Sequence, residues 1–171
     1  VYTLPIGRGE PVNLSNPIVN AVAGGWGVSG IFTSRSGQPF NAAASGDIAN
    51  VGAANGIRPD RICSNPYEKN GGTQYLNTAC FTTPAAFTFG TEGRNDLRSP
   101  HVTNLDFSVA KSFPLPVRRE TNLEFRAELF NALNLTPLGV PDTGITDTTF
   151  GLITTTATTE REIQFALKLH F

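Results

Sequence analysis

Strict alternation of apolar and polar positions marks the last part of the chain, residues 161–171. A period of two predicts a β-strand with one apolar face. Eleven residues at about 3.3 Å each are long enough, when the strand is tilted, to cross the hydrocarbon core of a bilayer. An amphipathic strand of a soluble sandwich has the same pattern, so this stretch alone leaves both interpretations open. The apolar positions are Ile163, Phe165, Leu167, Leu169 and Phe171.

The same period recurs upstream and predicts further strands over residues 25–36, 102–111 and 121–131, with shorter ones over 1–6 and 150–156. Residues 15–23 predict a short helix with Asn16 as N-cap and Pro17 at its first position. Asp106, Glu124 and Glu128 fall on the polar faces of their strands. These carboxylates either line the lumen of a barrel or face water on the outside of a soluble sheet.

Two long connections, residues 37–101 and 132–160, lack periodicity, whereas the other connections are shorter. A structureless loop of that length is uncommon in a compact soluble domain but is typical of the extracellular side of an outer-membrane barrel. Aromatic residues in the first connection predict that it folds on itself or on a neighbour, and they are candidates for contact with a ligand or partner. They are Tyr75, Phe81, Phe87 and Phe89.

Composition agrees with a turn-rich β protein. The 171 residues include 17 glycines and 12 prolines, and charged residues make up only 16%. The net charge of -1 gives no electrostatic reason to expect nucleic acid as a partner. We therefore predict one all-β unit over 1–171, an antiparallel meander of about five to six long strands with long loops.

Few residues point to chemistry. Cys63 and Cys80 have a spacing that suits a disulfide in an exported protein. With only two histidines, and no nucleophile triad or glycine-rich phosphate loop in the right context, we expect no metal, no cofactor and no enzymatic activity. The absence of methionine and the start at Val1 predict a mature, trimmed or partial chain.

Six consecutive motifs carry a family resemblance: YTLPIGRGE, GGWGVSGIFTSRSGQPF, NTACFTTPAAFTFGTEGRNDLRSP, NLDFSVAKSFPL, LEFRAELFNALNLTPLG and FGLITTTATTEREIQFALKLHF. In this order they resemble the C-terminal part of TonB-dependent outer-membrane receptors, in the Oar-like branch that carries a carboxypeptidase-regulatory-like domain. The resemblance covers essentially the whole chain. It implies a large barrel that binds or takes up ligands at the cell surface, with an upstream plug and the TonB system as partners. It also implies that the strand ending at Phe171 is recognised by the outer-membrane assembly machinery.

Five or six strands are too few to close a membrane barrel, whose smallest examples have about eight. Either the remaining strands of a longer receptor complete the sheet in the outer membrane, or neighbouring copies do so. The second case predicts a released β-rich fragment that assembles by strand addition into an extracellular filament or surface layer. In that case residues 163–171 act as the donor strand.

Overall fold

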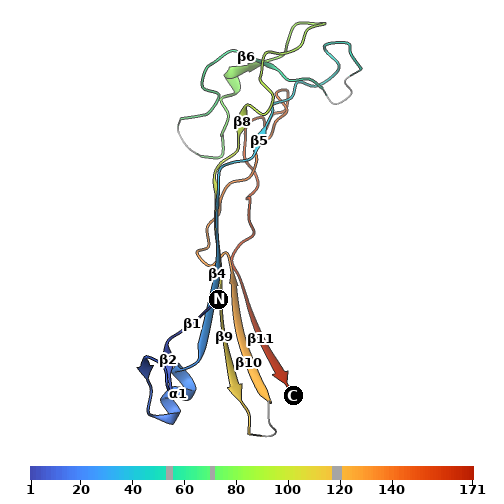
Figure 1. The fold of residues 1–171 in the computed structure, drawn as a ribbon. Coiled ribbons are helices and arrows are strands. Elements are labelled where there is room, and N and C mark those ends of the chain that lie inside the picture. The colour runs from blue at the N-terminus through green and yellow to red at the C-terminus, as the bar shows by residue number, and fades with distance from the viewer. Residues whose placement is uncertain (53–55, 70–71, 117–120) are drawn as a thin grey trace. The chain divides into compact units, whose positions relative to one another are not determined.

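The computed structural model describes residues 1–52, 56–69, 72–116 and 121–171 (Figure 1). The chain divides into two compact units, and each is described by itself. The first unit contains residues 1–33, 103–135 and 159–171, and the second contains residues 34–102 and 136–158. Within the described ranges, no helix has both the length and the apolar character needed to span a membrane.

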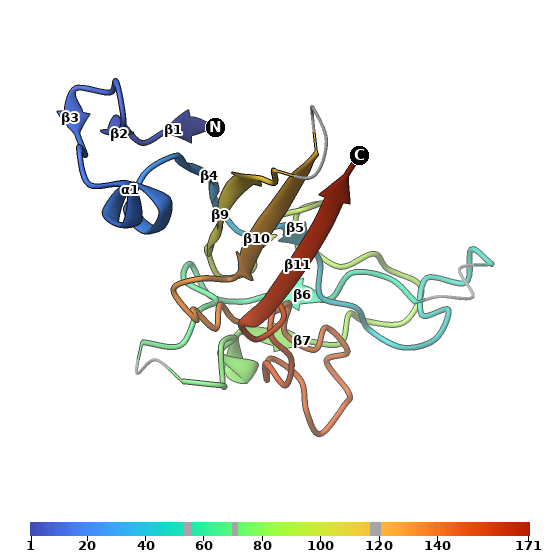
Figure 2. The same ribbon diagram turned by 90° about the horizontal axis from the view of Figure 1, so that it is seen from below.

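An antiparallel sheet forms the first unit, and the described residues supply five strands in the order β1-β4-β9-β10-β11. Strand order follows chain order, so the sheet is a meander that remains open (Figure 2). This confirms the predicted all-β fold, and the four long strands lie within three residues of their predicted bounds. The strands are β1 (Tyr2–Thr3), β4 (Trp26–Arg35), β9 (Val102–Pro114), β10 (Asn122–Phe130) and β11 (Glu162–His170).

The register of β9, β10 and β11 places apolar side chains in continuous rows across one face of the sheet. Successive residues of a strand point to opposite faces, so the intervening rows on the other face are mostly polar. Lys111 is an exception, because it occupies an apolar row opposite Phe125. Three apolar rows are Phe107–Leu129–Ile163, Val109–Ala127–Phe165 and Phe113–Leu123–Leu169.

The predicted helix is confirmed as α1 (Pro17–Ala23) in the connection between β1 and β4. Asn16 is its N-cap, and its side-chain oxygen accepts hydrogen bonds from the backbone N–H groups of Ile18 and Val19. Two further strands in this connection, β2 (Ile6–Gly7) and β3 (Val12–Asn13), pair in parallel. Part of the connection predicted between β9 and β10 lies outside the described residues.

Two predicted strands are wrong. The strand expected over residues 1–6 is divided into β1 and β2, because Pro5 has no N–H to continue the ladder and the chain leaves the sheet after Leu4. The short strand expected over 150–156 is absent from the described structure. Gly151 adopts a φ of +76° in a turn there, and only isolated bridges form at Leu152 and Thr156.

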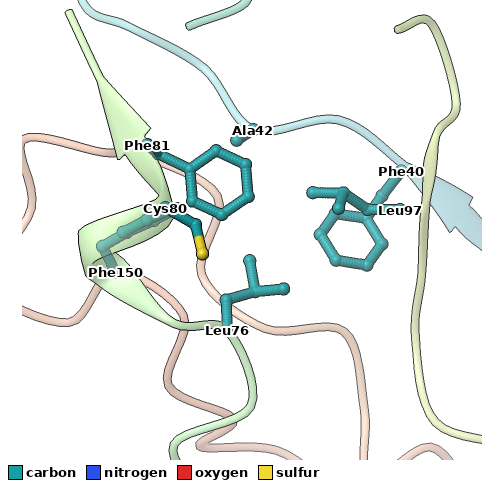
Figure 3. Packing of buried hydrophobic residues seen from close by; sticks show 7 residues of the cluster. All are labelled: Phe40, Ala42, Leu76, Cys80, Phe81, Leu97 and Phe150. Atoms are coloured by element: carbon teal, nitrogen blue, oxygen red, sulfur yellow. The ribbon is translucent and has the colours of Figure 1, made fainter. Parts of the chain in front are cut away.

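The second unit joins the two long connections into one folded body. Bridges pair Ala43 with Gly144 and Gln74 with Leu152, so each connection supplies part of the unit. A small core, shown in Figure 3, holds it together: Phe40, Ala42, Leu76, Cys80, Phe81, Leu97 and Phe150. Its regular elements are β5 (Pro39–Phe40), β6 (Asp60–Arg61), the 3-10 helix η1 (Thr78–Cys80), β7 (Phe81–Thr82) and β8 (Leu97–Arg98).

Candidate functional site

The predicted disulfide between Cys63 and Cys80 is confirmed, with 5.1 Å between the two Cα atoms. Asn77 caps η1 through a hydrogen bond from the N–H of Ala79, and this turn delivers Cys80 to the core. In the chain-entropy model, closing a loop of this size stabilises the fold by about 3 kcal/mol. The disulfide therefore closes the loop that contains Tyr75 and fixes the position at which Phe81 follows it.

Two of the four aromatic residues predicted to contact a ligand or partner take part in packing within the second unit. Phe81 is buried, and its ring meets that of Phe150 edge-on with 5.3 Å between centroids. Tyr75 packs against the core and donates its hydroxyl to the carbonyl of Arg98. Burial, with a smaller contribution from neighbouring Tyr67, raises the pKa of Tyr75 above its ordinary value. Phe81 thus belongs to the core, whereas Tyr75 packs against its outside.

The other two aromatic residues, Phe87 and Phe89, are exposed. Phe87 leaves 76% of its surface accessible and has a φ of +63°, a left-handed conformation that costs a bulky L-residue roughly 1–2 kcal/mol. Its backbone N–H is held by the carbonyl of Ile48. A large apolar ring is thus presented to solvent by a strained backbone, a combination that is enriched at functional sites.

Phe89 lines an open cavity of about 440 Å³ together with Asn41, Ile57, Arg58 and Gly90. A side chain at Gly90 would collide with the carbonyls of Arg58 and Pro59, since its Cβ would lie 2.1 Å and 2.3 Å from those oxygens. The site combines an aromatic ring, an amide and a guanidinium. This is a surface suited to a ligand that has both apolar and hydrogen-bonding groups.

Glu92 lies beside this cavity and is only 2% exposed. One carboxylate oxygen accepts a hydrogen bond from the N–H of Ala42 at 3.1 Å, and the other has no partner among the described residues. Burial is the main cause that raises its pKa from 4.5 to about 7. The Ala42 N–H opposes that rise, Asp96 adds to it, and Arg58 and Arg61 lower the pKa.

Other charged residues hold together the second unit, or loop unit (residues 34–102 and 136–158), and no sequence pattern singled them out. Arg61 pairs with Asp96 and donates to the carbonyls of Cys63 and Ser64 at 3.0 and 2.7 Å. Asp142 accepts from the Thr149 hydroxyl and the Gly144 N–H, and these bonds hold the pKa of the carboxyl below its ordinary value. The only signal for Glu92 was its place between the two glycines of GTEGRND, a stretch interpreted as a turn.

A network of ion pairs covers the polar face of β10 and β11. Arg126 contacts Glu124 at 2.8 Å and Glu128 at 3.7 Å, and His170 lies 3.2 Å from Glu124. Asp106 instead accepts hydrogen bonds from Asn104 and from the backbone of Asn131, both at 3.0 Å. Across the described part of the chain, no three His, Cys, Asp or Glu side chains are grouped as metal ligands.

The residues predicted to form an assembly strand lie on β11 or directly after it. Their side chains are all exposed, and four of them extend the apolar rows of β10. The backbone edge of β11 that faces away from β10 meets no other strand within the described residues. The predicted assembly residues therefore sit on an edge that is ready to pair with another strand. They are Ile163, Phe165, Leu167, Leu169 and Phe171.

Replacement of Glu92 by Gln should remove a pH dependence from the stability of the loop unit. The folded state raises the pKa of Glu92 from 4.5 to about 7. The free energy of unfolding is therefore largest below about pH 4.5, and it falls by up to about 3 kcal/mol as the pH rises through 7. In Glu92→Gln, which cannot ionise, this loss disappears. Hydrogen exchange of the Ala42 amide between pH 5 and 8.5, compared between variant and wild type at each pH, measures the effect.

The surface substitution Glu68→Gln in the same unit is the control for a general change in charge, and it should follow wild type at every pH. A difference between Glu92→Gln and wild type that stays constant over the pH range contradicts the assignment of the titration to Glu92.

Comparison with known proteins gives one family match. The model of the outer membrane beta barrel domain family matches residues 1–164, almost the whole chain. The searches of curated proteins and of solved structures returned no match. The open antiparallel sheet, with one apolar face and one polar face, has the architecture that this family requires. The chain thus belongs to the outer membrane β-barrel domain family and is part of an outer-membrane β-barrel protein.

Proposed function

We propose that this chain is the C-terminal barrel segment of a TonB-dependent outer-membrane receptor that binds a ligand at the cell surface and takes it up. The observation that carries the proposal is the second unit, in which two long connections share one core and a disulfide. Loops that only join strands need no core of their own. A folded, disulfide-bonded loop body that presents exposed aromatic rings is suited to ligand recognition.

Strand topology supports the extracellular placement of this unit. Because β9, β10 and β11 are antiparallel, the 36–101 and 131–161 connections leave the sheet at one end, and the short β9–β10 connection lies at the other. Outer-membrane barrels have long loops outside the cell and short turns in the periplasm. The sequence resemblance to TonB-dependent receptors adds the specific class.

The proposed partners follow from the open sheet. Five strands cannot enclose a lumen, so further barrel strands pair with the outer edges of β1 and β11. An upstream plug and the TonB system supply gating and energy, and the assembly machinery recognises the strand that ends in Phe171. The ion-paired polar face of β10 is suited to an aqueous lumen and to a structural role rather than to catalysis.

A filament of self-assembling copies is the second proposal, and the exposed edge of β11 favours it. Such an edge accepts any strand of suitable register, including one from another copy. The mass of the protein isolated from its source separates the two. A much heavier, detergent-soluble polypeptide supports the receptor, whereas detergent-free polymers of 18.3 kDa subunits support the filament.

Deletion of the gene should stop the energised uptake of at least one compound. Wild-type cells, deletion cells and wild-type cells treated with a proton uncoupler are grown in the same medium, and mass spectrometry follows which compounds are depleted. A receptor of this class predicts compounds whose depletion is lost in both the deletion and the uncoupled cells. Identical depletion by deletion and wild-type cells contradicts the proposal.

Phe87→Gly separates ligand contact from stability. Glycine accepts the left-handed backbone, so the loop unit should be as stable as wild type or about 1 kcal/mol more stable, while uptake falls. Phe89→Gly, whose backbone is not left-handed, is the matched control and should lose both uptake and stability. Protease resistance of the loops in whole cells reports stability. Wild-type uptake by Phe87→Gly would remove Phe87 from the ligand site.

Leu167→Lys tests the lipid-facing assignment of β11. A lysine on the lipid face costs about 2–4 kcal/mol at the bilayer midplane and less near the interface. Gln164→Lys places the same charge on the opposite face of the same strand, opposite Glu128, and should be harmless. The amount of folded, heat-modifiable barrel in outer-membrane fractions is the measurement. Equal losses in both variants would contradict the assignment of the faces.

A further inference from the structure

The short helix α1 is apolar on every side. Asn20 is its only polar residue, and the side-chain oxygen of Asn20 already accepts a hydrogen bond from the N–H of Arg8 at 2.8 Å. Ile18 leaves 75% of its surface exposed and Val22 leaves 68%. A helix that is hydrophobic all round is normally buried, and none of the described residues buries these side chains.

Side chains supply hydrogen-bond partners to backbone groups at both ends of α1. At the N-terminus, Asn16 accepts from two backbone N–H groups. At the C-terminus, the ammonium of Lys111 donates to the carbonyls of Ala21, Val22 and Gly24, and the indole N–H of Trp26 donates to Val22 at 2.9 Å. Helix ends in water need no such partners, but in a water-poor layer every unsatisfied backbone group is costly.

These contacts attach α1 to the apolar face of the sheet. Lys111 lies on that face and is only 5% exposed, because the helix carbonyls and the rings of Trp26 and Phe113 surround its ammonium group. The Trp26 ring meets Phe125 of the same face edge-on at 6.2 Å. The exposed surface of α1 is therefore continuous with the face that contacts lipid in this family.

The position of α1 along the sheet identifies the leaflet. The β1–β4 connection, which contains α1, leaves the sheet at the end where β9 ends and β10 begins (Figure 1). Short turns of outer-membrane barrels lie on the periplasmic side. Trp26, at the start of β4, is the type of residue that collects at a membrane interface.

We propose that α1 is an interfacial helix that lies in the periplasmic leaflet of the outer membrane, with Ile18, Val19 and Val22 among the phospholipid acyl chains. The helix carries no charge, so acyl chains rather than anionic headgroups are its partner. Lys111 positions it by binding its C-terminal carbonyls. This inference rests on the barrel family and is independent of the proposed receptor function.

Spin labels on the full-length protein in phospholipid vesicles test the proposal. Single cysteines replace Ile18 or Val22 in a background without other reactive thiols, and each label's collisions with oxygen and with a water-soluble nickel chelate are compared. Leu167→Cys is the control for lipid exposure. Glu10→Cys, an exposed position in the same connection, is the control for water. Vesicles contain phosphatidylethanolamine, with or without phosphatidylglycerol.

The expected oxygen-to-nickel collision ratio at residues 18 and 22 is close to that of Leu167, several-fold above that of Glu10, and the same in both vesicle types. A ratio equal to that of Glu10 overturns the proposal, as does a label shielded from both reagents, which indicates a covering protein. A ratio that rises only with phosphatidylglycerol overturns the acyl-chain assignment.

A second variant tests the role of Lys111. In Lys111→Met the helix carbonyls lose their donor, so the label at residue 22 should become more accessible to the nickel chelate while the barrel remains heat-modifiable. Lys168→Met, on the polar face of β11, is the matched control and should leave the label unchanged. An unchanged label in Lys111→Met overturns the positioning role.

Discussion

A backbone next to hydrocarbon must satisfy its own hydrogen bonds, because no water is present to do so. This constraint shapes the first unit. The ladders of β9, β10 and β11 pair N–H and C=O groups strand to strand, and the period of two then sends apolar side chains to one face and polar ones to the other. Among the described residues, the outer edges of β1 and β11 lack a neighbouring strand, as does the part of β4 beyond Val28 that β1 does not reach. These edges define what the chain needs from its surroundings.

The second unit is organised differently from the sheet. Where water can solvate the backbone, short strands of two residues suffice, and shape comes from side-chain hydrogen bonds, a disulfide and a small core. Arg61 illustrates the difference. Its guanidinium binds the Asp96 carboxylate and the carbonyls of Cys63 and Ser64, and so connects segments that no long strand pairing joins.

Sequence patterns predicted the first unit far better than the second. Alternation over nine or more residues is a strong signal, so the long strands and the register of their faces were recognisable, and the Asn16–Pro17 pair was sufficient for the helix. The loop aromatics gave no such guidance, because an exposed Phe87 and a buried Phe81 look alike without the contacts that bury one of them. Glu92 was missed for the same reason, since its raised pKa is created by burial that no local pattern encodes.

Lys111 shows how an exception to a pattern can be informative. A cation in an apolar row contradicts the alternation that predicted β9, and by itself it argues for an interruption of the strand. Three backbone carbonyls and two aromatic rings remove the contradiction, because they replace the water that the ammonium needs. The same contacts satisfy helix carbonyls that would otherwise face a water-poor layer. The helix carbonyls thus replace water around the Lys111 ammonium, and the ammonium in turn satisfies those carbonyls. This mutual solvation explains why the helix and the cation occur at the same end of this face.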